Sequence, residues 1–282
     1  MPRPAEIDAD SAGPSDAELT TVVEVDRLVA HYGKREILHE LSLGISAGEI
    51  HVIMGGSGSG KSTFLRHLLD LEQRSSGTIR VLGRELDQMK PQEATAFARS
   101  IGVAFQGGAL FSSMTVGENI MLPLREHTRL DRHTMEIMMR IKLEVVGLAG
   151  FEKLMPSELS GGMIKRAAFA RAIIMDPRIL FCDEPSAGLD PVTSAGLDQL
   201  ILRLREATRM TIVVVTHELE SAFRIADRIT VIDEGRILVT GTVETLKNSE
   251  IARVQDLLNG RIQQQETDPE AYLERLAGGV AS

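Results

Sequence analysis

A glycine-rich loop, framed by an apolar run and an amphipathic run, is the feature that most constrains how this chain folds. The loop reads GGSGSGKST and spans residues 55–63. Residues 48–55 form a short apolar run, which predicts a buried strand, and residues 61–72 carry apolar side chains at helical spacing. A flexible Gly/Ser linker would not be framed in this way. The pattern therefore predicts a loop that binds phosphate between a strand and a helix.

The chemistry of phosphate binding assigns a task to the residues of this loop. Glycines let the backbone pass close to phosphate with its N–H groups pointing inward, and a helix N-terminus adds partial positive charge. We expect Lys61 to reach the terminal phosphates and the Ser62 hydroxyl to ligate Mg²⁺. The residues expected to surround the phosphates with their backbone are Gly55, Gly56, Ser57, Gly58, Ser59, Gly60 and Thr63.

An acidic pair follows another apolar run. Residues 178–184 read RILFCDE, so a buried strand is expected to deliver two acids to the sheet edge where open α/β folds bind ligands. Asp183 is predicted to hold Mg²⁺ through water, and Glu184 to orient or deprotonate an attacking water. Alone, the pattern also describes a strand that ends in solvated acids. Its combination with the phosphate loop favours the catalytic interpretation.

Two further polar residues end predicted strands. Gln106 ends the run SIGVAFQ and is expected to reach the metal or the water. His217 ends TIVVVTH and is expected to donate a hydrogen bond to the γ-phosphate. Each has an ordinary structural alternative, a polar side chain at a strand end. We favour the functional interpretation because several strand ends would then converge on one phosphate.

The rest of the chain predicts an α/β fold with an inserted helical part. Strands alternate with helices, which indicates a mostly parallel sheet covered on both faces. Residues 107–175 form a block of mostly helical spacing with many charges, which predicts a separate helical lobe. We expect a disordered lead-in over 1–20, a domain over 21–247, and a helical extension over 248–282. That extension either lies on its own domain or binds a partner.

Composition narrows the class of partner. The net charge is −9 and tryptophan is absent, so the basic and aromatic surface of most nucleic-acid binders is not expected. No run of about 18 apolar residues occurs, and residues 1–20 lack an apolar core, so neither a membrane span nor a signal peptide is predicted. The single cysteine, Cys182, is compatible with a reducing compartment.

A second glycine-rich helix start occurs at LSGGM, residues 159–163. Ser160 is a candidate N-cap, and Gly161 and Gly162 allow close approach of a backbone at a helix N-terminus. Because the first site already has its own loop, we expect this segment to bind the γ-phosphate of a nucleotide held by another subunit, in a two-fold dimer that encloses two nucleotides. The alternative is a helix cap with a tight entry.

This ordered set of motifs resembles the nucleotide-binding subunit of ABC transporters over about residues 22–247. GGSGSGKST is similar to the Walker A motif of that family, ILFCDE to Walker B, LSGGM to the signature, and SAGLD, which ends in Asp190, to the D-loop. Gln106 matches the Q-loop glutamine, His217 the switch histidine, and Tyr32 the aromatic residue that stacks on adenine. The resemblance implies ATP and Mg²⁺ as ligands and ATP-driven closure of a homodimer. It also implies an α/β P-loop NTPase (RecA-like) core, an antiparallel β portion and the inserted α-helical lobe.

Finer features resemble the Mla/MCE-type phospholipid transporters of Gram-negative envelopes. They are residues 107–128, the run LMPSELSGGM and the C-terminal extension. This resemblance implies an integral-membrane permease, a periplasmic MCE-domain subunit and a small cytoplasmic STAS-domain subunit as partners. It also implies a peripheral position on the cytoplasmic face of the inner membrane, where the chain energises phospholipid transport between inner and outer membrane.

Three questions stay open at the level of sequence. The cargo is phospholipid or, alternatively, an amino acid, a metal or a lipoprotein; an ATPase acting on DNA or ribosomes fits poorly with one cassette and one cysteine. Met163 stands where many family members carry glutamine, and we expect activity to survive because the backbone amides are unchanged. The apolar residues expected either to meet the permease or to fill the lobe core are Phe111, Met114, Met121 and Leu122.

Overall fold

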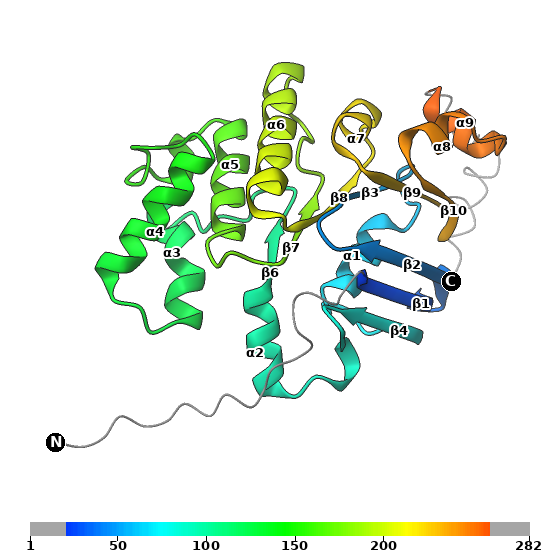
Figure 1. Cartoon of the computed structure of the whole chain (residues 1–282), viewed down its shortest axis with the longest axis horizontal. Helices are drawn as coiled ribbons and strands as arrows, with labels where there is room; N and C mark the ends of the chain where they lie inside the picture. Colours follow the sequence, from blue (N-terminus) through cyan, green and yellow to red (C-terminus); the bar gives the residue numbers. More distant parts are fainter. Residues whose placement is uncertain (1–20, 260–282) are drawn as a thin grey trace, which may run out of the picture.

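The centre of the computed structural model is a six-stranded sheet in the order β10-β9-β3-β8-β7-β6 (Figure 1). Strand β10 is antiparallel to β9, and the other neighbours are parallel. The structure describes residues 21–259, so the predicted lead-in and the tail beyond Asn259 lie outside the described residues. The strands are β3 (Ile50–Met54), β6 (Ile101–Ala104), β7 (Ile179–Asp183), β8 (Thr211–Thr216), β9 (Arg228–Asp233) and β10 (Arg236–Gly241).

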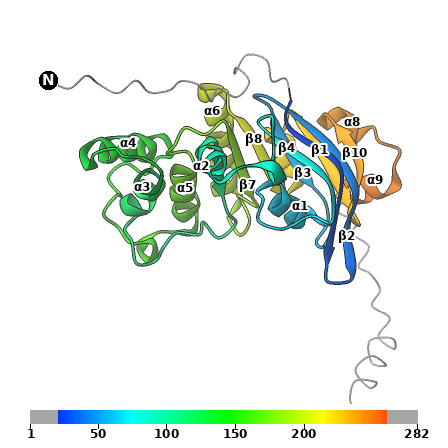
Figure 2. The same ribbon diagram turned by 90° about the horizontal axis from the view of Figure 1, so that it is seen from below.

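A second, antiparallel sheet lies against one side of the first, in the order β2-β1-β4-β5 (Figure 2). Its long first hairpin shows several register shifts between β1 and β2, as expected for a strongly twisted ribbon. The strands are β1 (Thr21–Tyr32), β2 (Arg35–Ser46), β4 (Ser76–Val81) and β5 (Arg84–Glu85). This sheet is the antiparallel portion that the resemblance to ABC transporters implies.

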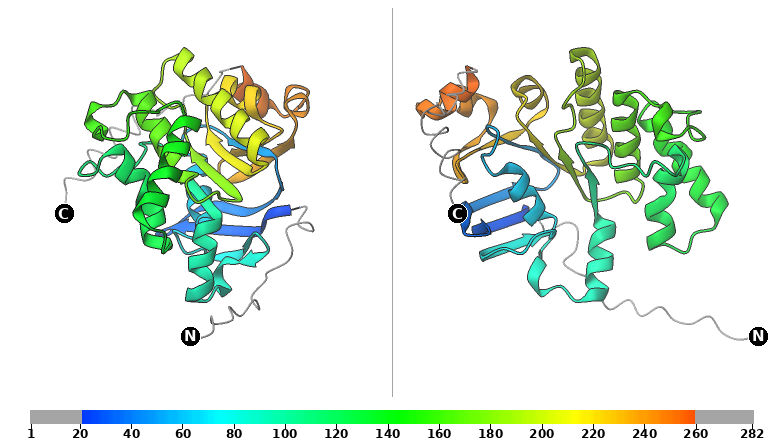
Figure 3. Two further views of the ribbon diagram at one scale, coloured as in Figure 1. Left: turned by 60° about the vertical axis from the view of Figure 1, so that its left-hand side comes forward. Right: turned by 180° about the vertical axis from the view of Figure 1, so that it is seen from behind.

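Nine α-helices are described within residues 21–259. They are α1 (Lys61–Leu68), α2 (Pro91–Ser100), α3 (Val116–His127), α4 (Arg132–Val145), α5 (Gly161–Ala172), α6 (Pro191–Thr208), α7 (Leu219–Ile225), α8 (Val243–Lys247) and α9 (Ala252–Leu258). Helices α3, α4 and α5 gather in a lobe at one end of the molecule, away from the antiparallel sheet (Figures 1 and 3). No helix of the described part is both long and apolar enough to cross a bilayer.

Helix α1 is enclosed between the two sheets. Phe64 and Leu68 are fully buried and share one hydrophobic cluster with Ile53 of the central sheet and Ile45 of the second sheet. A second cluster joins the central sheet to the lobe helices and to α6. Both faces of the central strands are therefore covered, which explains the near-continuous apolar runs in their sequences.

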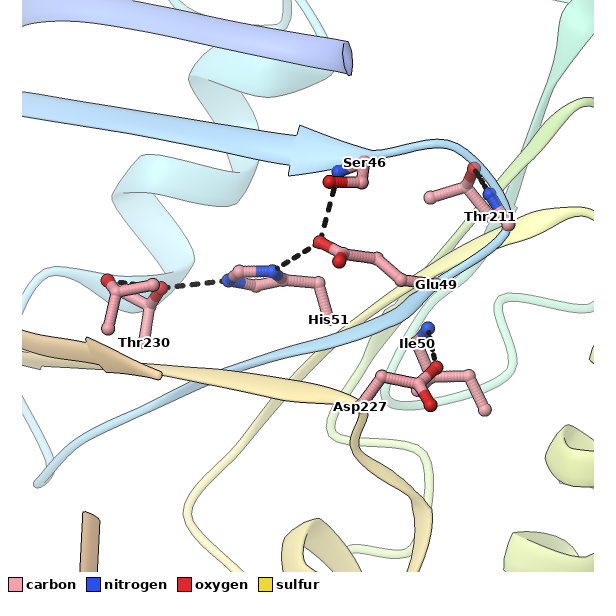
Figure 4. A network of polar contacts seen from close by, with 9 residues as sticks. Ser46, Glu49, Ile50, His51, Thr211, Asp227 and Thr230 are labelled. Atoms are coloured by element: carbon pink, nitrogen blue, oxygen red, sulfur yellow. Dashed lines mark hydrogen bonds and ion pairs between the residues drawn. The ribbon is translucent and has the colours of Figure 1, made fainter. Parts of the chain in front are cut away.

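A polar network holds the end of β3 opposite the glycine-rich loop (Figure 4). The buried ring of His51 lies between two side chains, with Nδ1 at 2.9 Å from Glu49 Oε1 and Nε2 at 2.8 Å from Thr230 Oγ1. The N–H of Ile50 donates to the carboxylate of Asp227 at 2.8 Å. These bonds satisfy polar groups that burial would otherwise penalise, and they fix β3 against β9. The loop thus leaves a strand whose far end is fixed in register.

The α/β fold with an antiparallel portion and a helical lobe agrees with the prediction. Asp190 caps α6, accepting hydrogen bonds from two backbone N–H groups at 3.0 Å, and Pro191 is the first helical residue, as an Asp-Pro pair before a helical run predicts. Helix α5 ends at Ala172, three residues before residue 175, where the helical block was expected to end. The first helix of the tail, α9, lies back on its own domain, where Val254 is fully buried.

Candidate functional site

The glycine-rich loop connects β3 to α1 at the carboxyl edge of the central sheet. A Cβ on Gly55 would lie 2.0 Å from the carbonyl oxygen of Ile232, so no other residue fits there without a shift of backbone. Gly60 has φ 104°, in the left-handed region, and a Cβ there would lie 2.8 Å from Leu38 Cδ2. The chain's own packing therefore requires glycine at both ends of the loop.

The turn between β9 and β10 supports this loop from behind. The N–H of Gly235 donates to the carbonyl of Ser59 at 3.0 Å, and the carbonyl of Gly235 accepts from the N–H of His39 at 2.9 Å. Asp233, at the end of β9, forms an ion pair with Arg253 of α9 at 2.6 Å. The start of the tail thus lies on the same turn that contacts the loop.

Lys61 is the first residue of α1, and its side chain turns back over the loop. Its Nζ donates to the carbonyl oxygens of Gly55 at 2.9 Å and Gly56 at 2.8 Å, and the side chain is buried. Burial lowers the pKa of Lys61, and the charges of Glu184 and Asp183 oppose that effect. The ammonium group therefore lies in the field of both predicted acids, at the mouth of the loop.

Asp183 ends β7 with an oxygen that finds no protein partner. Its Oδ1 is buried and makes no hydrogen bond within the described residues. Burial, followed by the negative charge of Glu184, raises the pKa of the Asp183 carboxyl, while neighbouring cations oppose the rise. A buried carboxylate oxygen without a partner costs free energy unless a ligand satisfies it. This oxygen has the chemistry of a ligand for a hard cation or for its bound water.

Glu184 is held by the end of the neighbouring strand β8. Its Oε2 accepts from the hydroxyl of Thr216 at 3.1 Å, and its Oε1 lies 2.8 Å from Nδ1 of His217. Its backbone has φ 45°, a conformation that is strained for a residue with a side chain. Its N–H donates to the carbonyl of Val215 at 2.8 Å, which holds this conformation. Strain of this kind concentrates at functional sites.

A buried lysine links Gln106 to this acidic end. Gln106 is exposed in the loop after β6, which itself ends at Ala104. The Nζ of Lys165, on α5, donates to the carbonyl oxygen of Gln106 and, at 3.2 Å, to that of Glu184. The backbone at Gln106 is therefore next to Glu184, while its side chain is free to meet a ligand.

The second glycine-rich start forms the exposed N-terminus of α5. Ser160 is the N-cap as predicted, and its Oγ accepts from the N–H of Met163 at 3.3 Å. A Cβ on Gly161 would meet only Leu189 Cδ2, at 3.7 Å, which is an ordinary contact. A Cβ on Gly162 would lie 2.6 Å from Thr193 Cγ2. The helix start is open to solvent, and no hydrogen bond within residues 21–259 joins it to the glycine-rich loop.

The predicted site residues fall into two groups. One group lies at the loop and the strand ends joined to it: Gly55, Gly56, Ser57, Gly58, Ser59, Gly60, Lys61, Ser62, Thr63, Gln106, Asp183, Glu184 and His217. The other group makes no hydrogen bond to the loop within residues 21–259: Tyr32, exposed at the β1–β2 turn, the α5 start at Ser160, Gly161 and Gly162, and Asp190, which caps α6. A single chain therefore carries one phosphate site and a separate open helix start.

Two residues at the site were not predicted from the sequence. Thr216 precedes His217 in the predicted strand and could have been marked by that adjacency. Lys165 is the one charged residue on the buried face of α5, four residues after Gly161. A lysine among apolar residues on such a face is unusual, and this could have marked it as a functional candidate. Its partners are backbone carbonyls, which a sequence pattern does not identify.

Comparison with known proteins gives a consistent result. Residues 38–187 match the family model described as ABC transporter. The intermembrane phospholipid transport system ATP-binding protein MlaF of Escherichia coli K12 is 40% identical over 228 residues, which cover 81% of this chain and 85% of that protein. Its namesake in Haemophilus influenzae is 39% identical over 239 residues, covering 85% of this chain and 90% of that protein.

A relative named for the transport of another cargo is equally similar. The probable ribonucleotide transport ATP-binding protein mkl of Mycobacterium leprae is 40% identical over 239 residues, covering 85% of this chain and 69% of that protein. Among solved structures, the dimeric post-hydrolysis ATP-binding cassette MJ0796 bound to ADP and Pi has a TM-score of 0.72 at 30% identity, covering 78% of this chain and 98% of that one. The protein cbiO1 of Clostridium perfringens has a TM-score of 0.74 at 27% identity, covering 86% and 97%.

Proposed function

Since the chain belongs to the ABC transporter family and is an ATP-hydrolysing cassette of it, we propose that it drives phospholipid transport between inner and outer membrane through a separate permease. The observation that carries this cargo is the match to two intermembrane phospholipid transport ATP-binding proteins over 85% and 90% of their length. In this role the chain is bound peripherally to the cytoplasmic face of the inner membrane.

The loop at β3 and α1 binds the phosphates of ATP. The backbone of residues 55–60 surrounds them, and Lys61 exchanges its bonds to two loop carbonyls for bonds to the terminal phosphates. The exposed Ser62 hydroxyl, the free side chain of Gln106 and the unpartnered Oδ1 of Asp183 form an oxygen donor set that fits Mg²⁺. When bound, Mg²⁺ supplies positive charge to the terminal phosphates.

Glu184 acts as the general base for the attacking water, and His217 positions it. The carboxylate already accepts a hydrogen bond from Thr216 and contacts the His217 ring, so its orientation is set before substrate arrives. His217 then donates to the γ-phosphate through its other nitrogen. Tyr32, exposed at the β1–β2 turn, stacks on the adenine ring.

Hydrolysis requires a homodimer of this subunit. The start of α5 at Ser160 and Gly161 is exposed and is not joined to the chain's own loop, so it is free to bind the γ-phosphate held by a second copy. Asp190, at the end of the SAGLD run, lies at the same seam, where it caps α6. Closure of the dimer encloses two nucleotides between the two chains. Hydrolysis then allows the two chains to separate.

The permease docks at a groove between the loop after β6 and helix α3. Phe105, Phe111, Leu122 and Pro123 line this groove with apolar atoms, and both phenylalanines are exposed. The buried side chain of Asn119 holds the loop in place through four hydrogen bonds to its backbone. The loop that presents the apolar surface also carries Gln106. A movement of the permease would therefore displace Gln106 at the ATP site.

Other partners extend this assembly. An apolar row of Ile137, Ile141 and Val145 is exposed along α4, at spacings of four residues that place it on one helical face. We assign this row to the small cytoplasmic STAS-domain subunit, since an exposed apolar row on a lobe is typical of a protein contact. The periplasmic MCE-domain subunit joins through the permease.

Purification of the tagged chain from membranes in mild detergent tests the proposed cargo. We expect an integral-membrane permease, an MCE-domain protein and tightly held phospholipid to accompany it, with Ile141→Asp removing only the small cytoplasmic partner. A permease that comes without lipid, or that comes with a soluble binding protein for an amino acid, a metal or a lipoprotein, would contradict the proposal.

A ribonucleotide is the second candidate cargo. The relatives named as ribonucleotide transport proteins are as identical to this chain as the phospholipid relatives, but the chain spans only 67% to 69% of their length. The same purification separates the two candidates, because retained nucleotide other than ATP or ADP, in a complex free of lipid, would favour the ribonucleotide.

A further inference from the structure

A buried cation lies where three functional segments meet. Lys165 is on α5, four residues after Gly161, so the two residues lie on one face of that helix, one turn apart. The residue is 8% exposed, and its Nζ reaches the carbonyl oxygens of Gln106 and Glu184. Lys165 thus belongs to the helix whose start is expected to meet a second subunit, and its ammonium group bonds to the backbone of the Gln106 loop and of the catalytic acid.

The surroundings of Lys165 are strongly acidic. Burial lowers the pKa of its ammonium group, and the charges of Asp183, Glu184 and Glu218 oppose that effect. A cation buried among carboxylates is held by them, and it offsets part of the repulsion between the two adjacent acids at the end of β7. Its position depends on both the backbone contacts and the charges.

We propose that Lys165 is a positioning residue that couples the start of α5 to the Glu184 carboxylate of the same chain. When the partner's nucleotide settles on the N-terminus of α5, the helix carries Lys165 with it. The ammonium group then sets the backbone of Glu184, and with it the direction of the carboxylate. Each subunit's base is aligned by the nucleotide of the other site. This inference rests on the proposed dimeric ATPase.

The same helix offers a matched comparison at Arg171. Its guanidinium donates to the carbonyl oxygens of Ala109 at 2.7 Å and Gly108 at 3.0 Å, in the loop that also carries Gln106. It therefore ties α5 to this loop as Lys165 does, but within residues 21–259 it makes no hydrogen bond to Glu184. If both residues only hold the helix against the loop, replacing either one should change kcat to a similar extent. If Lys165 is coupled to the base, only its replacement should lower kcat.

Steady-state kinetics of the purified full chain test the proposal. Lys165→Met is expected to lower kcat by about tenfold or more with KM for ATP within about twofold, since small misplacements of a catalytic group are costly and the phosphate loop is untouched. Lys165→Arg is expected to recover most of the kcat, because it keeps the cation. Arg171→Met is expected to lower the melting temperature while kcat stays within about twofold of the wild type.

Two outcomes would overturn the proposal. One is a kcat of Lys165→Met equal to that of the wild type. The other is an equal loss of kcat in Lys165→Met and Arg171→Met, which would make Lys165 a structural tie. The double variant Gly161→Ala with Lys165→Met adds a coupling readout: we expect losses smaller than the product of the two single effects, and a full product would also contradict the coupling. A failure of the phospholipid assignment would appear in the purified companions and would leave these kinetic results unchanged.

Discussion

Two helices of this chain, α1 and α5, begin with residues rich in serine and glycine. The two helix starts differ in how far other residues of the chain surround them. The start of α1 lies between two sheets, with Lys61 folded back on the loop and the turn at Gly235 bonded to it from behind. Helix α5 belongs to the helical lobe (Figure 1), and Ser160 and Gly161 at its start are exposed. The chain itself surrounds the start of α1, whereas it leaves the start of α5 open to solvent.

The glycines at the two starts have different physical reasons. At Gly55 a side chain would strike the carbonyl of Ile232, so the fold itself excludes other residues. At Gly161 a side chain would make an ordinary contact, so nothing within the described chain requires glycine. Gly162 is intermediate, because a side chain there would press on Thr193. Since the packing of its own chain does not require glycine at position 161, another molecule is expected to require it. A nucleotide on a second subunit, bound close to the backbone, would do so.

The largest expected effect, on ATP binding and turnover taken together, comes from breaking the enclosed start. Lys61→Ala should weaken ATP binding by about tenfold or more, because a hydrogen bond to a charged group contributes about 1.5–3 kcal/mol. Turnover should fall by about 10²–10³-fold, as for the loss of a preorganised charge. Equilibrium binding and phosphate release measure the two losses, with Arg132→Ala, an exposed change on α4, as the unaffected control. Unchanged ATP affinity would mean that the loop is not the nucleotide site.

The next effect isolates chemistry from binding at the enclosed site. Glu184→Gln keeps the size of the side chain and its contacts with Thr216 and His217 but removes the base. We expect kcat to fall by about 10²–10⁴-fold with ATP still bound. The ATP-bound dimer should then persist during size-exclusion chromatography with Mg²⁺. Full turnover, or ATP binding without dimerisation, would remove Glu184 from the role of base.

The comparison itself is tested by placing one methyl group at each start. Gly161→Ala should leave the melting temperature and the ATP affinity of the single chain unchanged, yet lower kcat by about tenfold, since the added Cβ meets the partner's nucleotide. Gly55→Ala should instead cost the chain about 1–3 kcal/mol of unfolding free energy, because it overpacks the loop. Thermal unfolding and ATPase assays of the two variants separate the effects. Normal turnover in Gly161→Ala would show that the open start binds nothing closely.

The enclosed start was the more predictable of the two. Its loop, its lysine and its strand-to-helix context follow from local periodicity and from glycine chemistry, so Gly55 and Lys61 could be placed from the sequence. The ends of β7 and β8 could be placed for the same reason, because continuous apolar runs identify buried parallel strands. The carboxyl edges of parallel strands coincide, which brings Glu184 and His217 together without further information.

What the sequence did not predict depends on contacts between distant segments. Lys165 bonds to carbonyl groups 59 and 19 residues away, and no residue type marks a carbonyl as a partner. Strand β2 was not assigned, and register shifts break its pairing with β1. Helix α2 was also missed; its apolar residues are a proline, three alanines and a single phenylalanine, so large apolar side chains do not mark its buried face. Asp190 was predicted to cap α6, which the structure confirms, and its predicted contact with nucleotide stays a prediction.

The smallest effect concerns the residue that follows the open start. Met163 is partly buried against the main hydrophobic cluster, and its N–H donates to Ser160 Oγ irrespective of the side chain. Met163→Gln should therefore change kcat by no more than about twofold and the unfolding free energy by about 0.5 kcal/mol, as for changes outside the core. Phosphate release and thermal unfolding measure both. A tenfold change in kcat without a change in stability would mean that this side chain reaches the partner's nucleotide. The start of α5 would then bind its ligand through a side chain as well as through backbone N–H groups. The two helix starts would then differ in the groups that contact nucleotide, in addition to their burial.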